Sequence, residues 1–474
     1  MTRFFSLIAF VAALTLGPSA QAADFHTIVV DNDFADCPQA DANTIQAGVA
    51  MAGAGDLVLV CAGSYTESVT IDAAHSDISV KAKGALGSVV LAGAGQAFGF
   101  GLNGAHGVLV EGFVVQGYMD DIVLMDADDN VIRGNETKLA AHHDGIELEA
   151  NSHRNLIEQN VSHDNLHNIS CGISVGGGSS HNFIRHNTAF HNANIGILLG
   201  GGLLGPAGPG NVIEHNSVFD NGKPVSGANR GVGILNSITP GSLIVHNQVM
   251  NNNAQGIVVT GATSSGVTVE HNFTMANGST NDDDGILIQA GAPGAVVRFN
   301  DSRLNRHDGI HLRAAQNALV DQNVLDQNGT PGVGNGCGID VDSLTSAGVT
   351  TPSTGNTVTN NITRGHDRAG IRIRNSSTNV VASNQVKDNP GDGILLTNGD
   401  NNSIDRNQSD HNGTLSTQAG IHVDAASSGN MLTTNNAFRN TEVDARDDNS
   451  AANTWSGNHC GTDLPPGTIC ENGS

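Results

Sequence analysis

The sequence is poor in aromatic side chains. Phe, Trp and Tyr make up 4 % of its 474 residues and Trp occurs once, whereas Gly occurs 60 times. Aromatic rings supply much of the buried area in bulky globular cores, so this composition favours thin layers joined by tight turns. The shortage of rings also counts against tight sugar binding by ring stacking.

Basic charge is scarce as well. Lys and Arg total 21 against 46 Asp and Glu, which gives a formal net charge of −25. Nucleic-acid binding depends on a basic surface, so we exclude nucleic acid as a partner. An anionic glycan would need a local basic patch or a bridging cation in order to bind.

Long apolar runs are lacking except at the N-terminus. Arg3 precedes the apolar run "FFSLIAFVAALTLG" (4–17), and Ala20 and Ala22 fit an A-x-A cleavage site. We predict a signal peptide over 1–22, cleaved near Ala22, and a secreted or periplasmic protein. The alternative is a membrane anchor, but the run is short and ends in small residues. No later segment reaches the ~18 apolar residues of a spanning helix, so we expect no membrane insertion.

Cysteine is also rare, and export permits the few cysteines to form disulfides. Four of the six lie as two close pairs near the ends of the chain, and we predict that each pair is bonded. We expect the other two, inside the repeats described below, to be free and buried. The predicted disulfides are Cys37–Cys61 and Cys460–Cys470.

What the chain does contain is a repeat of about 23–29 residues. Units such as "NLIEQNVSHDN" (155–165) and "NFIRHNTAFHN" (182–192) align on a central Asn, three residues after an aliphatic residue. A second strand of the form Gly-Ile-x-aliphatic lies between the units. Short period-2 strands separated by Asn and Gly turns predict a β-solenoid. The aligned residues are Asn135, Asn160, Asn187, Asn216, Asn247, Asn272, Asn300, Asn323, Asn361, Asn384, Asn407 and Asn435.

Exported repeats with such an Asn column resemble the right-handed parallel β-helix proteins, a superfamily that includes pectate lyases, polygalacturonases, alginate epimerases and periplasmic NosD-type proteins. The resemblance covers roughly residues 43–440. It implies an all-β chain, a single parallel β-helix of about twelve or more coils, with a short helical cap near residue 44 and a disulfide-closed C-terminal end. The predicted divisions are 1–22 (signal peptide), 23–100 (N-terminal cap and first coils), 101–440 (repeats) and 441–474 (C-terminal cap).

One outward patch stands out when the coils are aligned on Gly-Ile. Asp before that Gly recurs in four coils, which indicates turn chemistry. Beyond the Gly, three successive coils carry charged pairs where most coils carry bland residues. Because neighbouring strands lie about 4.8 Å apart, we predict a continuous polar patch, bordered by His307, Asp308 and Arg368. The three pairs are His311/Arg313, Asp340/Asp342 and Arg372/Arg374.

This patch has the groups needed to act on a uronic acid. Arginines would neutralise the sugar carboxylate, a His or Arg would abstract the C5 proton, and another group would serve the leaving oxygen or reprotonate the opposite face. We therefore predict a lyase or C5-epimerase acting on an acidic polysaccharide or other extracellular glycan. Asp340 and Asp342 are predicted to hold Ca²⁺, which takes carboxylate oxygens. The predicted catalytic residues are His307, Asp308, His311, Arg313, Arg372 and Arg374.

Other interpretations stay open. Opposite charges on neighbouring strands attract, so the patch also fits a structural lattice of ion pairs. The stretch "AHHDGIELE" (141–149) offers His143, Asp144 and Arg154 as alternate catalytic residues. It resembles the "DPHD"-like motif of alginate epimerases but lacks the first Asp and the Pro.

Two rival classes of function also stay open: a non-catalytic solenoid that binds glycan or a surface partner, and a periplasmic NosD-like metal-delivery accessory. A file of four histidines next to the Asn column would suit Zn²⁺ or Cu²⁺ only if their ring nitrogens converged, and we expect solvated turn residues instead. We expect a monomer. The four histidines are His186, His215, His246 and His271.

Overall fold

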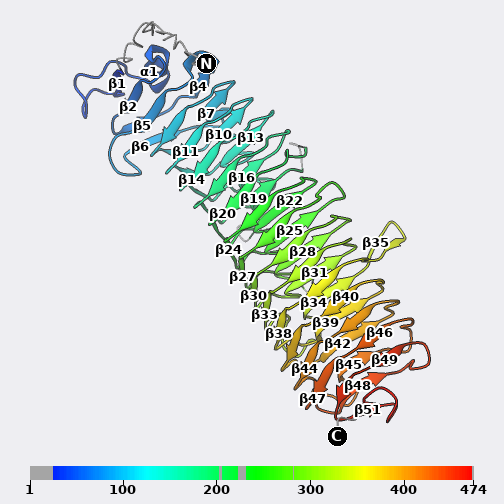
Figure 1. Cartoon of the computed structure of the whole chain (residues 1–474). Coiled ribbons are helices and arrows are strands. Elements are labelled where there is room, and N and C mark those ends of the chain that lie inside the picture. The colour runs from blue at the N-terminus through cyan, green and yellow to red at the C-terminus, as the bar shows by residue number, and fades with distance from the viewer. Residues whose placement is uncertain (1–24, 202–204, 223–230, 281, 472–474) are drawn as a thin grey trace, which may run out of the picture.

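The computed structural model describes residues 25–201, 205–222, 231–280 and 282–471, so the predicted signal peptide lies outside the described residues. The chain forms one long solenoid with its N-terminal and C-terminal ends far apart (Figure 1). This confirms the predicted single β-solenoid. The domain boundaries near residues 100 and 440 stay predictions.

Within the described residues, the strands form three long parallel sheets of 17, 16 and 16 strands, which corresponds to about 16 coils. The 17-stranded sheet runs from β1 (Thr27–Val30) to β49 (Thr454–Ser456), and one 16-stranded sheet runs from β3 (Gly63–Tyr65) to β50 (His459–Cys460). The other 16-stranded sheet carries the predicted patch and is called the site sheet below. Its strands are β4 (Val69–Asp72), β7 (Phe98–Asn103), β10 (Asp120–Met125), β13 (Ile146–Glu149), β16 (Cys171–Val175), β19 (Ile195–Leu199), β22 (Ile234–Ser237), β25 (Ile257–Thr260), β28 (Ile286–Gln289), β31 (Ile310–Arg313), β34 (Cys337–Asp342), β39 (Ala369–Arg374), β42 (Asp392–Thr397), β45 (Ala419–Val423), β48 (Val443–Asp447) and β51 (Asp463–Leu464).

Inward aliphatic residues fill the space between the sheets. The residue three positions before each central Asn is fully buried, as at Ile132, Ile157 and Ile184. Because each coil is thin, its apolar side chains are covered by the coils above and below. The core is therefore a continuous column rather than a central mass.

Asparagine side chains form hydrogen-bonded ladders along the solenoid. In the predicted central ladder, Asn160 Nδ2 donates to Asn187 Oδ1 (3.1 Å), and the same bond recurs from coil to coil. Two further ladders follow the same pattern, one through Asn155 and one through Asn165. These buried amides satisfy the backbone groups of the turns, where no strand pairing exists.

Both ends of the solenoid carry the features predicted from the sequence. Helix α1 (Ile45–Met51) lies at the N-terminal end (Figure 1), with Thr44 as its N-cap and Ile45 and Val49 buried. The disulfides Cys37–Cys61 and Cys460–Cys470 are present, and the two remaining cysteines are free and buried, as predicted. None of the described helices is long and apolar enough to cross a membrane.

An antiparallel hairpin, β35 (Leu344–Ser346) and β36 (Val349–Thr351), follows β34 and projects from the solenoid (Figure 1). It is inserted next to the predicted patch.

Candidate functional site

The structure brings the predicted patch together as the alignment indicated. His311, Asp340 and Arg372 lie side by side on β31, β34 and β39, and Arg313, Asp342 and Arg374 form the neighbouring row. The two rows occupy the outer surface of the site sheet. The register deduced from the Gly-Ile positions is therefore confirmed.

The first row is more deeply buried than an outward patch would suggest. His311 is 2 % exposed, Asp340 0 % and Arg372 3 %. The turn before β34 and the hairpin after it supply Asn335 and Leu344 to the same cavity wall, so these segments shelter the row from solvent. The sequence alignment registers strands on one another but does not show how the turns fold over them.

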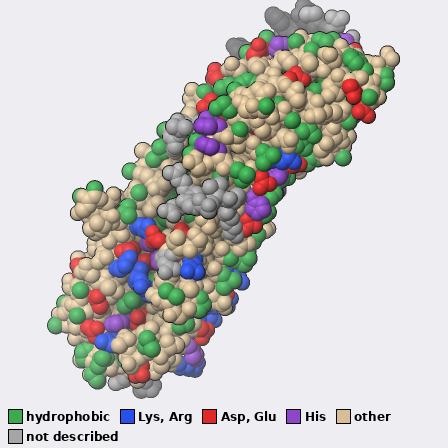
Figure 2. All heavy atoms as spheres, turned by 180° about the vertical axis from the view of Figure 1, so that it is seen from behind, with side chains coloured by type: hydrophobic (Ala, Val, Ile, Leu, Met, Phe, Trp, Pro, Cys, Tyr) green, Lys and Arg blue, Asp and Glu red, His purple; other side chains and the backbone are tan. Residues whose placement is uncertain are grey.

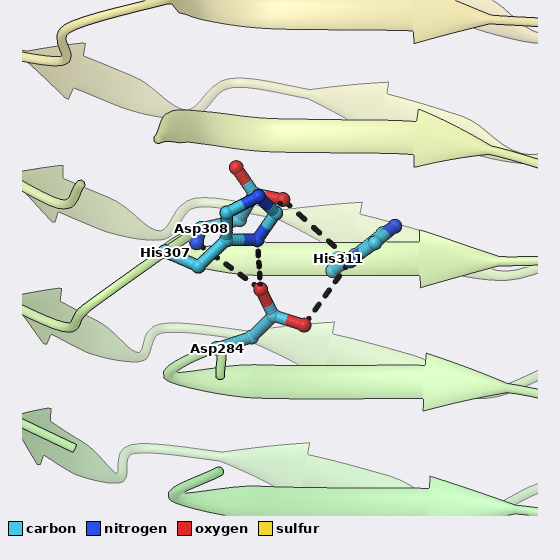
Figure 3. A group of neighbouring side chains, drawn as sticks. All are labelled: Asp284, His307, Asp308 and His311. Carbon is cyan, nitrogen blue, oxygen red and sulfur yellow. Dashed lines mark hydrogen bonds and ion pairs between the residues drawn. The ribbon is translucent and has the colours of Figure 1, made fainter. Parts of the chain in front are cut away.

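Four of the groups form a compact cluster, drawn in Figure 3. Asp284, from the turn before β28, lies between two histidines of the next coil. His307 Nδ1 is 2.8 Å from Asp284 Oδ1, and His311 Nδ1 is 3.1 Å from Asp284 Oδ2. Asp308 Oδ2 lies 3.0 Å from His307 Nδ1 and 3.5 Å from His311 Nδ1. We call Asp284, His307, Asp308 and His311 the histidine–aspartate cluster.

Ion pairs connect this cluster to the neighbouring coils. Arg372 holds Asp340 through two hydrogen bonds, one of them from Nε to Oδ1 at 2.9 Å. Arg374 pairs with Asp342 along the second row through Nη2 alone. Because both carboxylates already have guanidinium partners, Ca²⁺ at Asp340 and Asp342 would have to replace them. Calcium binding there stays a prediction.

Burial and neighbouring charge compete in setting the protonation of the cluster. Burial lowers the pKa of His307, but Asp308 and Asp284 outweigh it and raise that pKa to about 11. Burial also lowers the pKa of His311, but Asp284 and Asp340 outweigh this effect and raise the pKa above its usual value. In turn, the two histidines hold the pKa of Asp284 below its usual range in spite of its burial. The neighbouring carboxylates therefore favour the protonated form of both imidazoles.

Aspartate before the Gly-Ile strand acts between coils rather than within its own bend. The backbone N–H of Cys337 donates to Asp308 Oδ1 (2.6 Å), and that of Ala419 donates to Asp392 Oδ1 (2.7 Å). The structural role predicted for this Asp is therefore confirmed, but its partner is the backbone of the next coil. At the cluster the same Asp keeps its second oxygen for the histidines.

Beside the cluster lies a cavity of about 380 Å³. Four arginines line it together with His307 and His311, and Asp282 and Asp342 are the acidic groups in the wall. Figure 2 shows basic and acidic side chains gathered on the C-terminal half of one face of the solenoid. In a chain of net charge −25, this is a local concentration of arginines, three of which pair with aspartates. The arginines are Arg313, Arg368, Arg372 and Arg374.

Two acidic residues of this site were missed from the sequence. Asp284 was assigned to turn chemistry, and Asp282 was not considered, although it pairs with Arg313. Asp284 directly precedes the Gly-Ile strand of its own coil. That coil comes immediately before the coil of "RHDGIH" (306–311). Aligning each Asp with the histidines of the following coil would have identified it.

The alternate residues lie in a separate groove on the N-terminal half of the site sheet. Its volume is about 800 Å³, and its wall is largely apolar, with Phe98, Leu198 and Leu235 among the lining residues. His143 Nδ1 lies 3.3 Å from Asp120 Oδ2, and Asp144 accepts a hydrogen bond from Ser174. The structure therefore places His143 and Asp144 together.

Arg154 is not part of that groove. Its guanidinium binds Asp128 and Asp129 in the turns outside the site sheet. Glu147, on β13, lines the groove instead, and it is 5 % exposed. Burial, together with Asp120 and Asp144, raises the pKa of Glu147 to about 10. At neutral pH Glu147 is therefore protonated and carries no charge.

The file of four histidines is exposed and stacked. Neighbouring ring centroids lie 4.9–5.0 Å apart, and each residue has a positive φ, as expected for a turn. The prediction of solvated turn residues is confirmed.

The family described as the right handed beta helix region matches residues 26–202 and 98–274, and a model described as periplasmic copper-binding protein (NosD) matches 335–467. No curated protein sequence matches the chain. Three solved structures illustrate its likeness to known proteins. The Azotobacter vinelandii mannuronan C-5 epimerase AlgE6 A-module is 13 % identical, with 84 % of this chain and 94 % of that one covered and a TM-score of 0.48.

The Dettilon tailspike protein is 16 % identical, with 74 % and 63 % covered and a TM-score of 0.51. The periplasmic alginate epimerase AlgG is 14 % identical, with 86 % and 84 % covered and a TM-score of 0.45. At such identities the likeness concerns the fold.

Proposed function

The chain belongs to the right-handed β-helix family, and from this premise we propose that it acts on an acidic polysaccharide at the arginine-lined cavity of the site sheet. The observation that carries the proposal is the convergence of four arginines and two histidines on one cavity of an otherwise acidic protein. Guanidinium groups bind carboxylates through paired hydrogen bonds. A uronate chain is the glycan that such a cavity favours.

We propose proton abstraction at the uronate C5 as the reaction. The neutral imidazole of His311, whose Nε2 has no hydrogen-bond partner among the described residues, takes the C5 proton. Arg374, whose side chain is 40 % exposed, and Arg313 neutralise the sugar carboxylate and so stabilise the carbanion that this transfer leaves. Loss of the C4 oxygen then gives an unsaturated product, whereas return of a proton to the opposite face gives the C5 epimer. The cationic His307 suits proton donation in either outcome.

A non-catalytic glycan-binding solenoid is the second candidate. The observation that favours it is that neighbouring carboxylates raise the pKa of both cluster histidines, since a protonated imidazole cannot accept the C5 proton. Both candidates use the same arginines for recognition, so they differ in chemistry and not in the place of binding. We also propose that the protein is exported to the periplasm or the medium and acts as a monomer.

The test is incubation of the whole chain with alginate, pectate and glycosaminoglycans, with and without Ca²⁺. Ultraviolet absorbance reports the double bond of a lyase product, and NMR of the polymer reports C5 inversion. We expect one of these signals, and its loss in Arg374→Gln. If neither signal appears with any polymer, the enzymatic proposal is wrong. If activity survives His311→Ala and Arg372→Ala, the proposed site is wrong.

A further inference from the structure

We propose that the histidine–aspartate cluster is a closed, four-coordinate binding site for a divalent transition-metal cation of the Zn²⁺ class. The ligand atoms would be His307 Nδ1, His311 Nδ1 and one carboxylate oxygen each from Asp284 and Asp308. These atoms all lie within 4.8 Å of one another, and all four residues are buried (Figure 3). This inference does not depend on the proposed substrate.

The spacing of the four donors fits such an ion. The two histidine nitrogens lie 2.8 and 3.1 Å from Asp284 oxygens, and 3.0 and 3.5 Å from Asp308 Oδ2. Zn²⁺ binds nitrogen and oxygen at about 2.0–2.1 Å in a tetrahedron, which separates neighbouring ligand atoms by about 3.3 Å. The nitrogen–oxygen distances are close to this value, although His307 faces Asp284 Oδ1 and His311 faces Asp284 Oδ2.

One oxygen of the cluster lacks a hydrogen-bond donor. Asp308 is fully buried and its Oδ1 accepts from the backbone N–H of Cys337, but its Oδ2 has no hydrogen-bond partner among the described residues. The Nδ1 atoms of both imidazoles lie within hydrogen-bond distance of Asp284 oxygens. A cation at the centre would bond to Asp308 Oδ2 as well, and so would satisfy a buried oxygen that is costly to leave unpaired.

The charge and the donor types select the class of ion. Two buried carboxylates need two positive charges, which either two protons or one dication can supply. A set of two imidazoles and two carboxylates suits Zn²⁺ and similar ions. Ca²⁺ instead takes six to eight oxygen ligands. Arg313 Nη2 also lies 3.5 Å from His311 Nδ1, where Asp282 offsets its charge.

A supporting layer also surrounds the cluster. Metal-bound histidines usually direct their other ring nitrogen at a carboxylate. His311 Nε2 is buried without a hydrogen-bond partner among the described residues, and Asp340 Oδ2 lies 3.7 Å from it. Asp340 is fixed by Arg372. This places a second-layer carboxylate beside His311.

The chain contains a matched site that lacks half of the donors. His422 stands in the same column as His311, and its Nδ1 lies 3.3 Å from Asp392 of the preceding coil, as His311 lies from Asp284. However, Gln418 and Ala419 occupy the places of His307 and Asp308. The repeat therefore supplies a His–Asp pair twice, and completes it to four donors once.

The test is Zn²⁺ binding to the whole chain after dialysis against a chelator, followed by isothermal titration and by Co²⁺ substitution. We expect one equivalent of Zn²⁺ and the intense visible absorption of tetrahedral Co²⁺. His307→Gln should weaken this binding by at least about 100-fold, since even second-layer partners contribute about 10–100-fold. His422→Gln should bind as the wild type does.

His307 is the preferred target because Asp308→Asn also disturbs the hydrogen bond from Cys337 and so tests folding at the same time. Circular dichroism checks that each variant is folded. Absence of Zn²⁺ binding, an octahedral Co²⁺ spectrum, or equal binding by His307→Gln would each overturn the proposal. The last result would assign the ion to another place, such as the exposed histidine file.

Discussion

At the scale of single residues, burial decides how each charged side chain behaves. Arg372 and Arg374 are alternate residues of β39, and each pairs with an aspartate of β34. Their side chains are nevertheless 4 % and 40 % exposed. A buried pair has lost its water, so removing one partner leaves a charge without compensation. Asp342, the partner of Arg374, is itself only 6 % exposed. A pair that is exposed on both sides, such as Arg154 and Asp129, keeps its water and contributes little.

We therefore predict that Arg372→Met lowers the free energy of unfolding by about 3–5 kcal/mol. Arg154→Met, a control in a pair exposed on both sides, should lower it by less than about 1 kcal/mol. Urea denaturation measures both values. Equal losses in the two variants would show that burial does not distinguish the pairs.

Glu147 gives a residue-scale prediction with a pH dependence. Its pKa of about 10 in the folded protein lies above the value of the unfolded chain, so the unfolded chain releases a proton that the folded protein keeps. The contribution of Glu147 to the free energy of unfolding is therefore most favourable below the unfolded pKa, and it becomes less favourable as pH rises towards 10. Glu147→Gln should raise the unfolding free energy by about 2–3 kcal/mol at pH 7.

The measurement is urea denaturation of wild type and variant from pH 5 to pH 9. The difference between them should widen with pH. Glu149→Gln, on the same strand but partly exposed, is the control and should change little. A Glu147→Gln variant that is less stable than the wild type at every pH would contradict this account.

At the scale of elements, the ladders show how one residue can replace another. His366 occupies an Asn position in one ladder. The backbone N–H of Asn328 donates to His366 Nδ1 (3.2 Å), and the backbone N–H of His366 donates to Asn389 Oδ1 (3.0 Å). Its Nε2 lies 3.1 Å from Leu325 O. A neutral imidazole thus imitates a carboxamide, with one nitrogen accepting and the other donating.

Because burial lowers the pKa of His366 to about 4, the unfolded chain binds a proton between pH 6.5 and 4 that the folded protein does not. Stability from this residue is therefore present above the unfolded pKa and is lost on acidification. We expect the wild type to lose up to about 2 kcal/mol between pH 7 and 5 because of this residue. His366→Asn should lack that loss, as thermal unfolding at the two pH values would show. An unchanged pH dependence in the variant would refute the prediction.

The elements themselves could be predicted from the sequence, because every coil repeats the same aliphatic and Asn positions. The two additional ladders were also readable, since units such as "NLIEQNVSHDN" (155–165) carry Asn at intervals of five. The depth of His311 and the place of Arg154 could not be predicted. Both depend on turns of irregular length, which no repeat period describes.

At the scale of the whole molecule, the site sheet carries two unlike cavities on one long face. The N-terminal groove is largely apolar and acidic, whereas the C-terminal cavity is lined by arginines. We therefore expect an extended acidic polymer to bind at the C-terminal cavity rather than in the N-terminal groove. The register of the strands brings the arginines of the C-terminal cavity together. Because the chain as a whole has a net charge of −25, we expect an acidic polymer to be attracted at that cavity only.

The most direct test of the account is the affinity of the whole chain for a soluble polyuronate, measured by isothermal titration at two salt concentrations. The account predicts binding that salt weakens and that Arg374→Gln weakens by about 10-fold or more, because a charge-assisted hydrogen bond contributes about 1.5–3 kcal/mol. Arg154→Gln, outside the cavity, should bind as the wild type does. Equal binding of a neutral polysaccharide, or equal binding by Arg374→Gln, would contradict it.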